Sequence, residues 1–205
     1  MKLERDEYLE MIHTGNLRGV SPTQVMLHGP TKLLVDNYHW HSPEKGIVAS
    51  YTPKEFDVID HFGIFRGVDQ VEAFAQATTG SCGTFLECRK LNCTPDELKD
   101  KFIPSFISIG QVNFHYYLEP GDTFVSLGNI TFCRWRQTVC DGRIYKAPKD
   151  LDLDAYFSDF TDERLLKYDI SEDFILVADL FNITGRAILV DFFKKNEENG
   201  KTRNT

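Results

Sequence analysis

Residues 60–76 read DHFGIFRGVDQVEAFAQ, in which a histidine ends a short apolar segment and a glycine opens a helix. The helix carries one carboxylate, Glu72, among small and apolar side chains, and His61 lies eleven positions before it. A helix that is small or apolar on nearly every side is buried rather than lying on a surface. Burial favours the protonated form of a carboxyl group, and an imidazole is largely neutral at pH 7. The pair therefore predicts a buried central helix and a site for proton transfer.

The segments around this helix predict antiparallel strands. Alternating or continuous apolar residues separated by turn residues indicate six of them: 33–41 returning as 47–51, then 105–118 with a break at 110–111, 123–127, and finally 174–181 joined by a turn at 182–185 to 187–193. Helices are expected at 2–14, from 67 to 80 with continuation to 91, and after the cap Thr94. A sheet wrapped around one helix is an α+β arrangement.

Composition limits the class of protein. The chain has 205 residues and a net charge of −8, which argues against nucleic acid as its partner. The N-terminus shows no apolar signal core, and no apolar run has the length of a membrane span. The five cysteines are odd in number and form no Cys-x-x-Cys motif, so we expect free thiols and a cytoplasmic location.

An ordered set of motifs resembles one known family. The motifs cover about half of the chain, in the size range of one domain, and they are Leu33–Asp36, Phe56–Phe62, Gly67-Val68, Glu72–Gln76 and Leu118–Asp122. They are similar to the 3-hydroxyacyl-acyl-carrier-protein dehydratases, which have a hot-dog fold. The resemblance implies an α+β hot-dog fold, an antiparallel sheet around a central helix, and a lyase of fatty-acid or polyketide biosynthesis. It also implies an acyl carrier protein or coenzyme A thioester as partner, no cofactor beyond the substrate's phosphopantetheine, and a homodimer.

The resemblance assigns the catalytic roles. His61 matches the catalytic histidine and Glu72 the catalytic acid of the central helix. Gly67 matches the glycine whose amide polarises the thioester carbonyl, and Gln76 the glutamine one turn after the acid. In the family, the histidine and the acid meet from opposite protomers. Dehydration needs just such a base, acid and oxygen-binding donors, and no metal.

The loop between the two motifs departs from the family. Gly63–Arg66 is about three residues shorter than the family's loop and lacks its prolines. We expect Gly63 to supply an amide and an apolar tunnel to be lined by Phe62, Phe65, Val68 and Phe74. Arg66 is a candidate contact for the carrier protein.

Domain organisation is expected to be simple. Residues 1–25 form a helical extension, 26–195 a single hot-dog domain with an insertion at about 131–168, and 196–205 a disordered tail. Basic residues gather at one place, Arg134, Arg136, Arg143 and Lys146. Arg134 and Arg136 are candidates for binding a carrier or its phosphate, although a solvated strand face is the favoured interpretation.

Other interpretations stay open. His39 and His41 share a strand face as a metal pair would, but without a third ligand we expect an exposed strand end and no metal site. His115 is expected to face solvent or an interface. A hot-dog thioesterase is the alternative enzyme, ranked lower because such enzymes present a carboxylate without the histidine motif. A non-catalytic acyl-binding subunit is the third possibility, favoured only by the short loop.

Overall fold

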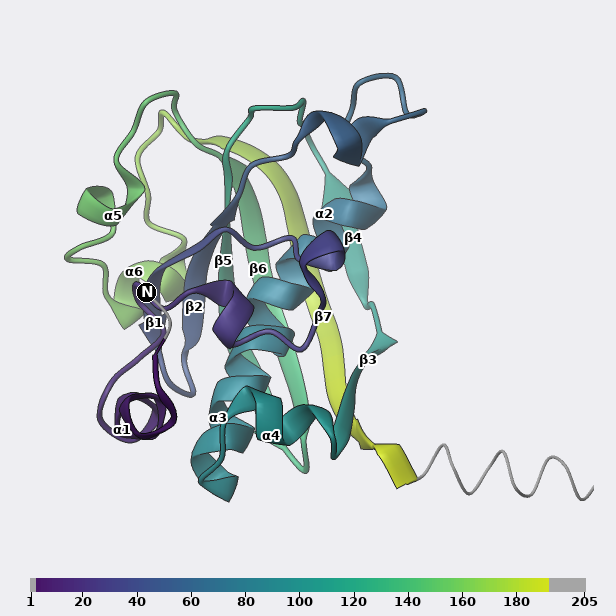
Figure 1. The fold of residues 1–205 in the computed structure, drawn as a ribbon. Coiled ribbons are helices and arrows are strands. Elements are labelled where there is room, and N and C mark those ends of the chain that lie inside the picture. The colour runs from purple at the N-terminus through teal and green to yellow at the C-terminus, as the bar shows by residue number, and fades with distance from the viewer. Residues whose placement is uncertain (1–2, 192–205) are drawn as a thin grey trace, which may run out of the picture.

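A seven-stranded antiparallel sheet curves around one long helix in the computed structural model, which describes residues 3–191 (Figure 1). The strand order is β1-β2-β5-β6-β7-β3, with β4 also paired to β7. The strands are β1 (Asn37–Ser42), β2 (Gly46–Tyr51), β3 (Phe102–Ser108), β4 (Gln111–Phe114), β5 (Phe124–Arg134), β6 (Gln137–Lys146) and β7 (Ile175–Leu189). The helices are α1 (Arg5–Thr14), η1 (Pro22–Gln24), η2 (Pro30–Lys32), η3 (Glu55–Val58), α2 (Gly67–Ala75), η4 (Gln76–Gly80), α3 (Ser81–Leu91), α4 (Pro95–Lys99), α5 (Leu153–Tyr156) and α6 (Asp162–Lys167).

The central helix runs through α2, η4 and α3 and contains one π-helical segment, η4. A π turn widens the helix and displaces carbonyl groups from their usual partners. Three hydroxyl groups donate to carbonyls here: Thr78 to Phe74, Thr79 to Ala75, and Ser81 to Gln76. These short polar side chains therefore satisfy the backbone where the α-helical pattern breaks.

Glycine residues let the sheet approach this helix closely. Gly128 of β5 lies opposite Gly142 of β6. A Cβ atom at Gly128 would overlap Thr78, and one at Gly142 would lie 2.5 Å from the ring of Phe74. Any larger residue at this pair would push the helix off the sheet, because packed interiors tolerate little added volume.

The outer face of the sheet is covered by the segment 147–174. Its residues Phe157, Phe160 and Leu165 pack with Val48 of β2 and Leu127 of β5 in one apolar cluster. All six residues of β2 are buried as a result, since the central helix covers the other face. Sheets covered on both faces have strands without exposed positions.

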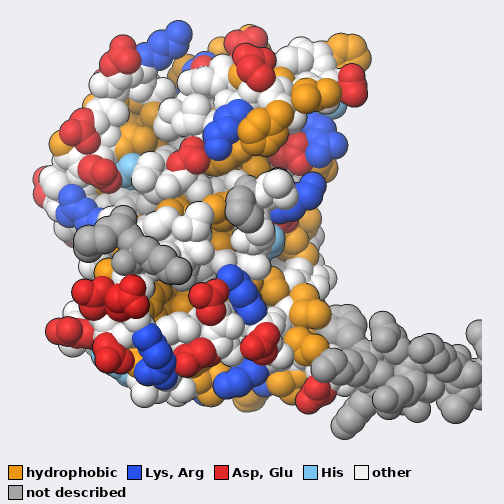
Figure 2. Space-filling view, viewed as in Figure 1, with side chains coloured by type: hydrophobic (Ala, Val, Ile, Leu, Met, Phe, Trp, Pro, Cys, Tyr) orange, Lys and Arg blue, Asp and Glu red, His pale blue; other side chains and the backbone are white. Residues whose placement is uncertain are grey.

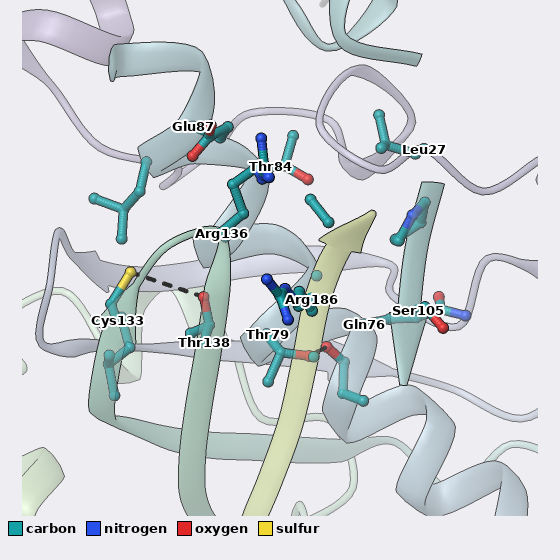
Figure 3. A pocket seen from close by; sticks show the side chains of 18 of the residues that line it. Leu27, Gln76, Thr79, Thr84, Glu87, Ser105, Cys133, Arg136, Thr138 and Arg186 are labelled. Carbon is teal, nitrogen blue, oxygen red and sulfur yellow. Dashed lines mark hydrogen bonds between the residues drawn. The ribbon is translucent and has the colours of Figure 1, made fainter. Parts of the chain in front are cut away.

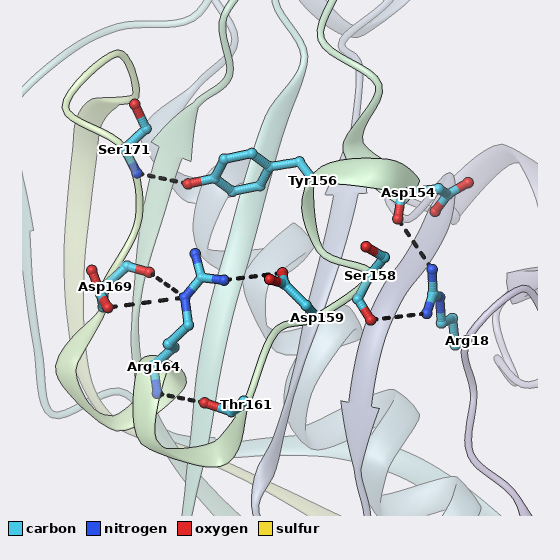
Figure 4. A network of polar contacts seen from close by, with 9 residues as sticks. All are labelled: Arg18, Asp154, Tyr156, Ser158, Asp159, Thr161, Arg164, Asp169 and Ser171. Carbon is cyan, nitrogen blue, oxygen red and sulfur yellow. Dashed lines mark hydrogen bonds and ion pairs between the residues drawn. The ribbon is translucent and has the colours of Figure 1, made fainter.

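Polar contacts fix this covering segment in place (Figure 4). Arg164 donates to Asp159 and to the carbonyl of Asp169. Arg18 donates to the carbonyls of Asp154 and Ser158, which ties the N-terminal segment to it.

Several predicted elements are confirmed. The continuous helix from 67 to 91, the helix after Thr94 and the returning strand of the first hairpin are present. The predicted break at 110–111 separates β3 from β4. The first strand begins at Asn37 rather than at 33, and the strand predicted to reach 118 ends at Phe114.

The prediction of two final strands joined by a turn at 182–185 was wrong. One strand, β7, runs through this region. Asn182 has a φ angle of 54° and forms an irregularity within β7. Its backbone amide donates to Asp141, and the strand continues beyond it. Gly185 is required by close packing, since a Cβ there would lie 2.6 Å from Thr79 Oγ1. Residues 192–193 and the expected tail, 196–205, lie outside the described residues.

The expected insertion begins later than 131. Residues 131–146 belong to the hairpin of β5 and β6, within the main sheet. The segment outside the sheet is 147–174.

Candidate functional site

The carboxyl group of Glu72 is held by Gln76, one helical turn further on. Gln76 Nε2 donates to Glu72 Oε1 at 2.8 Å and to the carbonyl of Lys32 at 2.8 Å. Gln76 Oε1 accepts from the amide of Leu34 at 2.8 Å. The amide group therefore uses both of its protons and its oxygen, and this network fixes its orientation. Gln76 is buried, whereas the side chain of Glu72 is 35% exposed, more than a fully buried helix would give.

His28 is a neighbour of Glu72 that sequence analysis missed. Its Nε2 lies 3.8 Å from Glu72 Oε1. Burial lowers the pKa of His28, and the charge of Glu72 partly opposes that effect. Its Nδ1 is buried and has no hydrogen-bond partner within residues 3–191. His28 lies in an irregular segment that has no periodicity, so nothing in the sequence pointed to this contact.

A cavity of about 660 Å³ opens beside Glu72 (Figure 3). It extends over the central helix and is lined also by residues of β3, β5, β6 and β7. Much of its lining is polar or charged. Its polar and charged residues include His28, Glu72, Gln76, Thr79, Thr84, Glu87, Arg89, Lys90, Ser105, Arg134, Arg136, Thr138 and Arg186.

His61 lies in the loop that follows η3 and does not line this cavity. Its Nδ1 is 2.9 Å from the carbonyl oxygen of Ile64. A carbonyl only accepts, so Nδ1 carries the proton and the neutral ring presents Nε2 as an acceptor. The next residue, Phe62, is 94% exposed. Within the described residues, no hydrogen bond or ion pair joins His61 to Glu72.

The other predicted site residues fall in different environments. Gly67 begins α2, and a Cβ there would lie 2.8 Å from the ring of Phe114. Phe65 and Phe74 are buried in the core. Val68 is 68% exposed, and neither it nor the loop residues Phe62, Gly63 and Phe65 line the cavity. One chain by itself thus does not bring the expected tunnel residues together.

The basic residues separate into paired and unpaired groups. Arg66 pairs with Asp69, Arg143 with Asp179, and Lys146 with Asp122. His115 also contacts Asp179 and is exposed, as expected. Arg134 and Arg136 lie at the hairpin of β5 and β6 and line the cavity.

The expectation that His39 and His41 are exposed was wrong. Both are buried, because the segment 147–174 and the N-terminal segment fold over them. His39 contacts Asp154 at 2.6 Å and Ser50 at 2.8 Å. His41 Nδ1 accepts from the amide of Leu17, and burial lowers the pKa of His41 to about 3.

Residues 3–191 contain no group of three or more metal-ligating side chains placed to hold a metal ion. Their helices are too short or too polar to cross a bilayer. The five cysteines are free thiols, of which Cys133 is exposed.

Among the comparisons with known proteins, one solved structure supports the fold. No protein-family model and no curated protein sequence matches the chain. The dehydratase heterocomplex ApeI:P from Xenorhabdus doucetiae superposes with a TM-score of 0.57 and 11% identity, covering 83% of this chain and 93% of that one. A putative thioesterase from Lactococcus lactis has a TM-score of 0.43 and 11% identity, over 70% and 78% of the two chains. A hypothetical thioesterase from Streptococcus pneumoniae, solved with coenzyme A, has a TM-score of 0.42 and 10% identity, covering 76% of this chain and 87% of that one.

At 11% identity, the likeness to the dehydratase heterocomplex ApeI:P establishes a shared architecture only. The antiparallel sheet wrapped around the helix of residues 67–91 agrees with it. The protein is therefore a member of the hot-dog fold class.

Proposed function

We propose that this protein is a lyase that removes water from a 3-hydroxyacyl thioester to give the trans-2-enoyl thioester. The observation that carries the proposal is the carboxyl group of Glu72, fixed by Gln76 at the wall of a cavity of about 660 Å³. That volume is within the range of about 300–1,000 Å³ typical of small-molecule sites. The only chemistry required is proton transfer, for which a positioned carboxyl group is suited.

In this proposal each group has one role. His61 Nε2 takes the proton from the α-carbon, since its Nδ1 is already committed to Ile64. Glu72 gives its proton to the departing hydroxyl group, which leaves as water. The amides of Gly67 or Val68, at the positive end of α2, hold the thioester oxygen as negative charge develops on it. Gln76 positions Glu72, and the substrate rides on phosphopantetheine without a further cofactor.

The complete site would be shared between two protomers. The exposed loop of His61 and Phe62 is available to reach a second copy of the chain. Apolar side chains exposed on the edge strands β3 and β4 and the residues between them need a cover in water, which a homodimer would supply; these are Ile103, Phe106, Ile107, Ile109 and Phe114.

The carrier is proposed to be an acyl carrier protein of fatty-acid or polyketide synthesis in the cytoplasm, with coenzyme A as the alternative. An acidic carrier would meet basic side chains, for which Arg66, Arg134 and Arg136 are the candidates. Arg66 is already paired with Asp69, so the two arginines of the β5–β6 hairpin are the stronger of these candidates.

Hydrolysis of the thioester is the second candidate. The specific observation in its favour is that Glu72 is partly open to solvent while His61 lines a different part of the surface. A carboxylate in contact with water can act as a general base without the histidine.

One assay separates these functions. The protein is incubated with a 3-hydroxybutyryl thioester, and both the enoyl product and the free thiol are followed. Enoyl product that disappears in His61→Ala and in Glu72→Gln supports dehydration, whereas release of thiol supports hydrolysis. The absence of both products across several chain lengths and carriers would contradict both enzymes and favour an acyl-binding subunit.

A further inference from the structure

Two arginines face the cavity beside the central helix without an acidic partner among the described residues. Arg136 and Arg186 are adjacent at the ends of β6 and β7, where the amide of Ala187 donates to the carbonyl of Arg136 at 2.9 Å. Figure 3 shows their side chains reaching towards the helix near Thr79 and Thr84. Within residues 3–191, neither guanidinium forms an ion pair with a carboxylate.

The cavity as a whole is positive in an otherwise acidic protein. Its basic residues are Arg89, Lys90, Arg134, Arg136 and Arg186, and its acidic ones are Glu44, Glu72 and Glu87. Glu87 is already 3.9 Å from Lys90. The chain carries a net charge of −8, so this local excess of positive charge is not a property of the whole surface. Figure 2 shows one face of the molecule, on which acidic and basic side chains are interspersed.

The turn that presents Arg136 is strained. Trp135 and Arg136 have φ angles of 51° and 63°, between the paired residues Arg134 and Gln137. Such two-residue turns normally take Asn or Gly, because a left-handed backbone is unfavourable for other residues. Strained backbone is retained where it places a side chain that function needs. Here it leaves the ring of Trp135 77% exposed and places Arg136 at the cavity.

The guanidinium of Arg136 is also partly removed from water, and the described residues do not satisfy all of its hydrogen-bond donors. Its guanidinium lies 5.1 Å from the centre of the Phe102 ring. Its Nε is buried, and no acceptor for it exists in the described part of the chain. A buried donor left unpaired destabilises the protein, and an anionic ligand would remove that cost. A guanidinium matches the oxygens of a phosphate or a carboxylate geometrically.

We propose that Arg136 and Arg186 form a subsite that binds an anionic group of the thioester substrate, either a phosphate or a carboxylate. Assigning the anion to a thioester rests on the proposed function, whereas the binding of an anion does not. Gly185 packs on Thr79, seven residues after Glu72, which places the subsite about 10 Å along the helix from Glu72. The hydroxyl groups of Thr84 and Ser105 line the same cavity and can donate to the anion.

The first experiment measures binding without catalysis. Trp135 lines the cavity, so its fluorescence reports occupancy in a Trp40→Phe background. Inorganic pyrophosphate and glutarate are titrated into this protein, into the double variant Arg136→Gln/Arg186→Gln, and into Arg5→Gln, whose side chain does not line the cavity. We expect saturable binding of at least one anion, weakened at least tenfold in the double variant only. No binding, or equal binding by the double variant with an unchanged melting temperature, overturns the proposal.

The second experiment identifies the source of the anion. Three 3-hydroxyacyl thioesters are compared: a neutral acyl chain on coenzyme A, the same chain on N-acetylcysteamine, and an acyl chain with a terminal carboxylate on N-acetylcysteamine. A tenfold rise in KM for the double variant with only the first identifies the phosphate, and with only the third the carboxylate. An equal rise with all three overturns the subsite. If none is turned over, the dehydratase proposal fails while the binding experiment still decides the subsite.

Discussion

Gln76 connects the carboxyl group of Glu72 to the segment before the sheet, because one amide group bonds to Glu72, Lys32 and Leu34 at the same time. The carboxyl position therefore depends on the path of residues 32–34 as well as on the helix. Such a network holds a group within the narrow range of geometry that catalysis needs.

Replacing Gln76 by Met is expected to affect stability and rate together. The side chain keeps its approximate size but loses all three hydrogen bonds, which leaves buried backbone groups unpaired and should cost about 2 kcal/mol or more. A misplaced Glu72 should lower kcat by up to about 100-fold with little change in KM. Urea unfolding and steady-state kinetics measure the two effects. Glu72→Gln is the control, and it is expected to abolish turnover while the protein keeps nearly wild-type stability. An unaltered kcat in Gln76→Met would contradict the role of Gln76 in positioning Glu72.

Mixing two inactive variants tests whether the site is shared. If His61 of one protomer serves Glu72 of its partner, a dimer of His61→Ala with Glu72→Gln has one intact site and one doubly altered site. Random reassociation should restore about one quarter of wild-type activity, because half of the dimers are mixed and each has one working site. Activity is measured after unfolding and joint refolding. Activity that stays at the level of the separate variants would contradict the shared site.

The contact between His28 and Glu72 predicts a measurable titration. Burial lowers the pKa of His28, and the negative charge of Glu72 raises it in part. Glu72→Gln removes the charge but keeps the shape, so the pKa of His28 should fall further. The ring protons of His28 can be followed by NMR across pH 4–8 in both proteins, with His28→Gln to assign the signal. An unchanged pKa of His28 in the variant would mean that the two side chains are not neighbours in solution.

Acid should destabilise the fold through His41. Its ordinary pKa is 6.5, and burial lowers it to about 3 in the folded protein. Between these two values the unfolded chain binds a proton that the folded chain does not. Stability is therefore fully present above pH 6.5 and is lost as the pH falls, by up to about 1.4 kcal/mol per pH unit.

His41→Gln should flatten this dependence, since glutamine can still accept from Leu17 but does not titrate. Free energies of unfolding in urea at pH 7, 6 and 5 provide the comparison. The free energy of unfolding of the variant is expected to be lower than that of the wild type at pH 7 and to decrease less as the pH falls. Parallel curves would assign the acid sensitivity to other groups.

The close approach of sheet and helix makes Gly142 intolerant of a methyl group. A Cβ there would meet the ring of Phe74, which is fully buried and cannot move aside. Gly142→Ala should cost about 1–3 kcal/mol, the usual effect of overpacking. Gly29→Ala is the matched control, because a Cβ at Gly29 meets nothing within 4 Å. Equal thermal unfolding temperatures for the two variants would show that the helix can shift at little cost.

The central helix and its carboxylate were predictable because they depend on local periodicity. Glu72 and Gln76 are one turn apart in any helix, so their hydrogen bond follows from the sequence itself. His28 was not predictable, because its contact with Glu72 depends on the path of an irregular segment.

The errors have a common physical origin in tertiary packing. Asn182 and Gly185 are turn residues by preference, yet one forms an irregularity within β7 and the other makes room for Thr79. His39 looked like the exposed end of a strand, but the segment 147–174 returns over it from far along the chain. Local sequence carries no information about such a cover.

β7 pairs with β6, β3 and β4, so the last strand of the fold is also the one that joins most of the sheet. During synthesis, β3 and β4 emerge long before their partner exists. In the nascent chain, β3 and β4 therefore remain unpaired, with their apolar side chains uncovered, until residues 175–189 have been synthesised. Folding of this protein should consequently be slow, late and sensitive to chaperones, because the pairings that close the sheet join segments far apart in the chain.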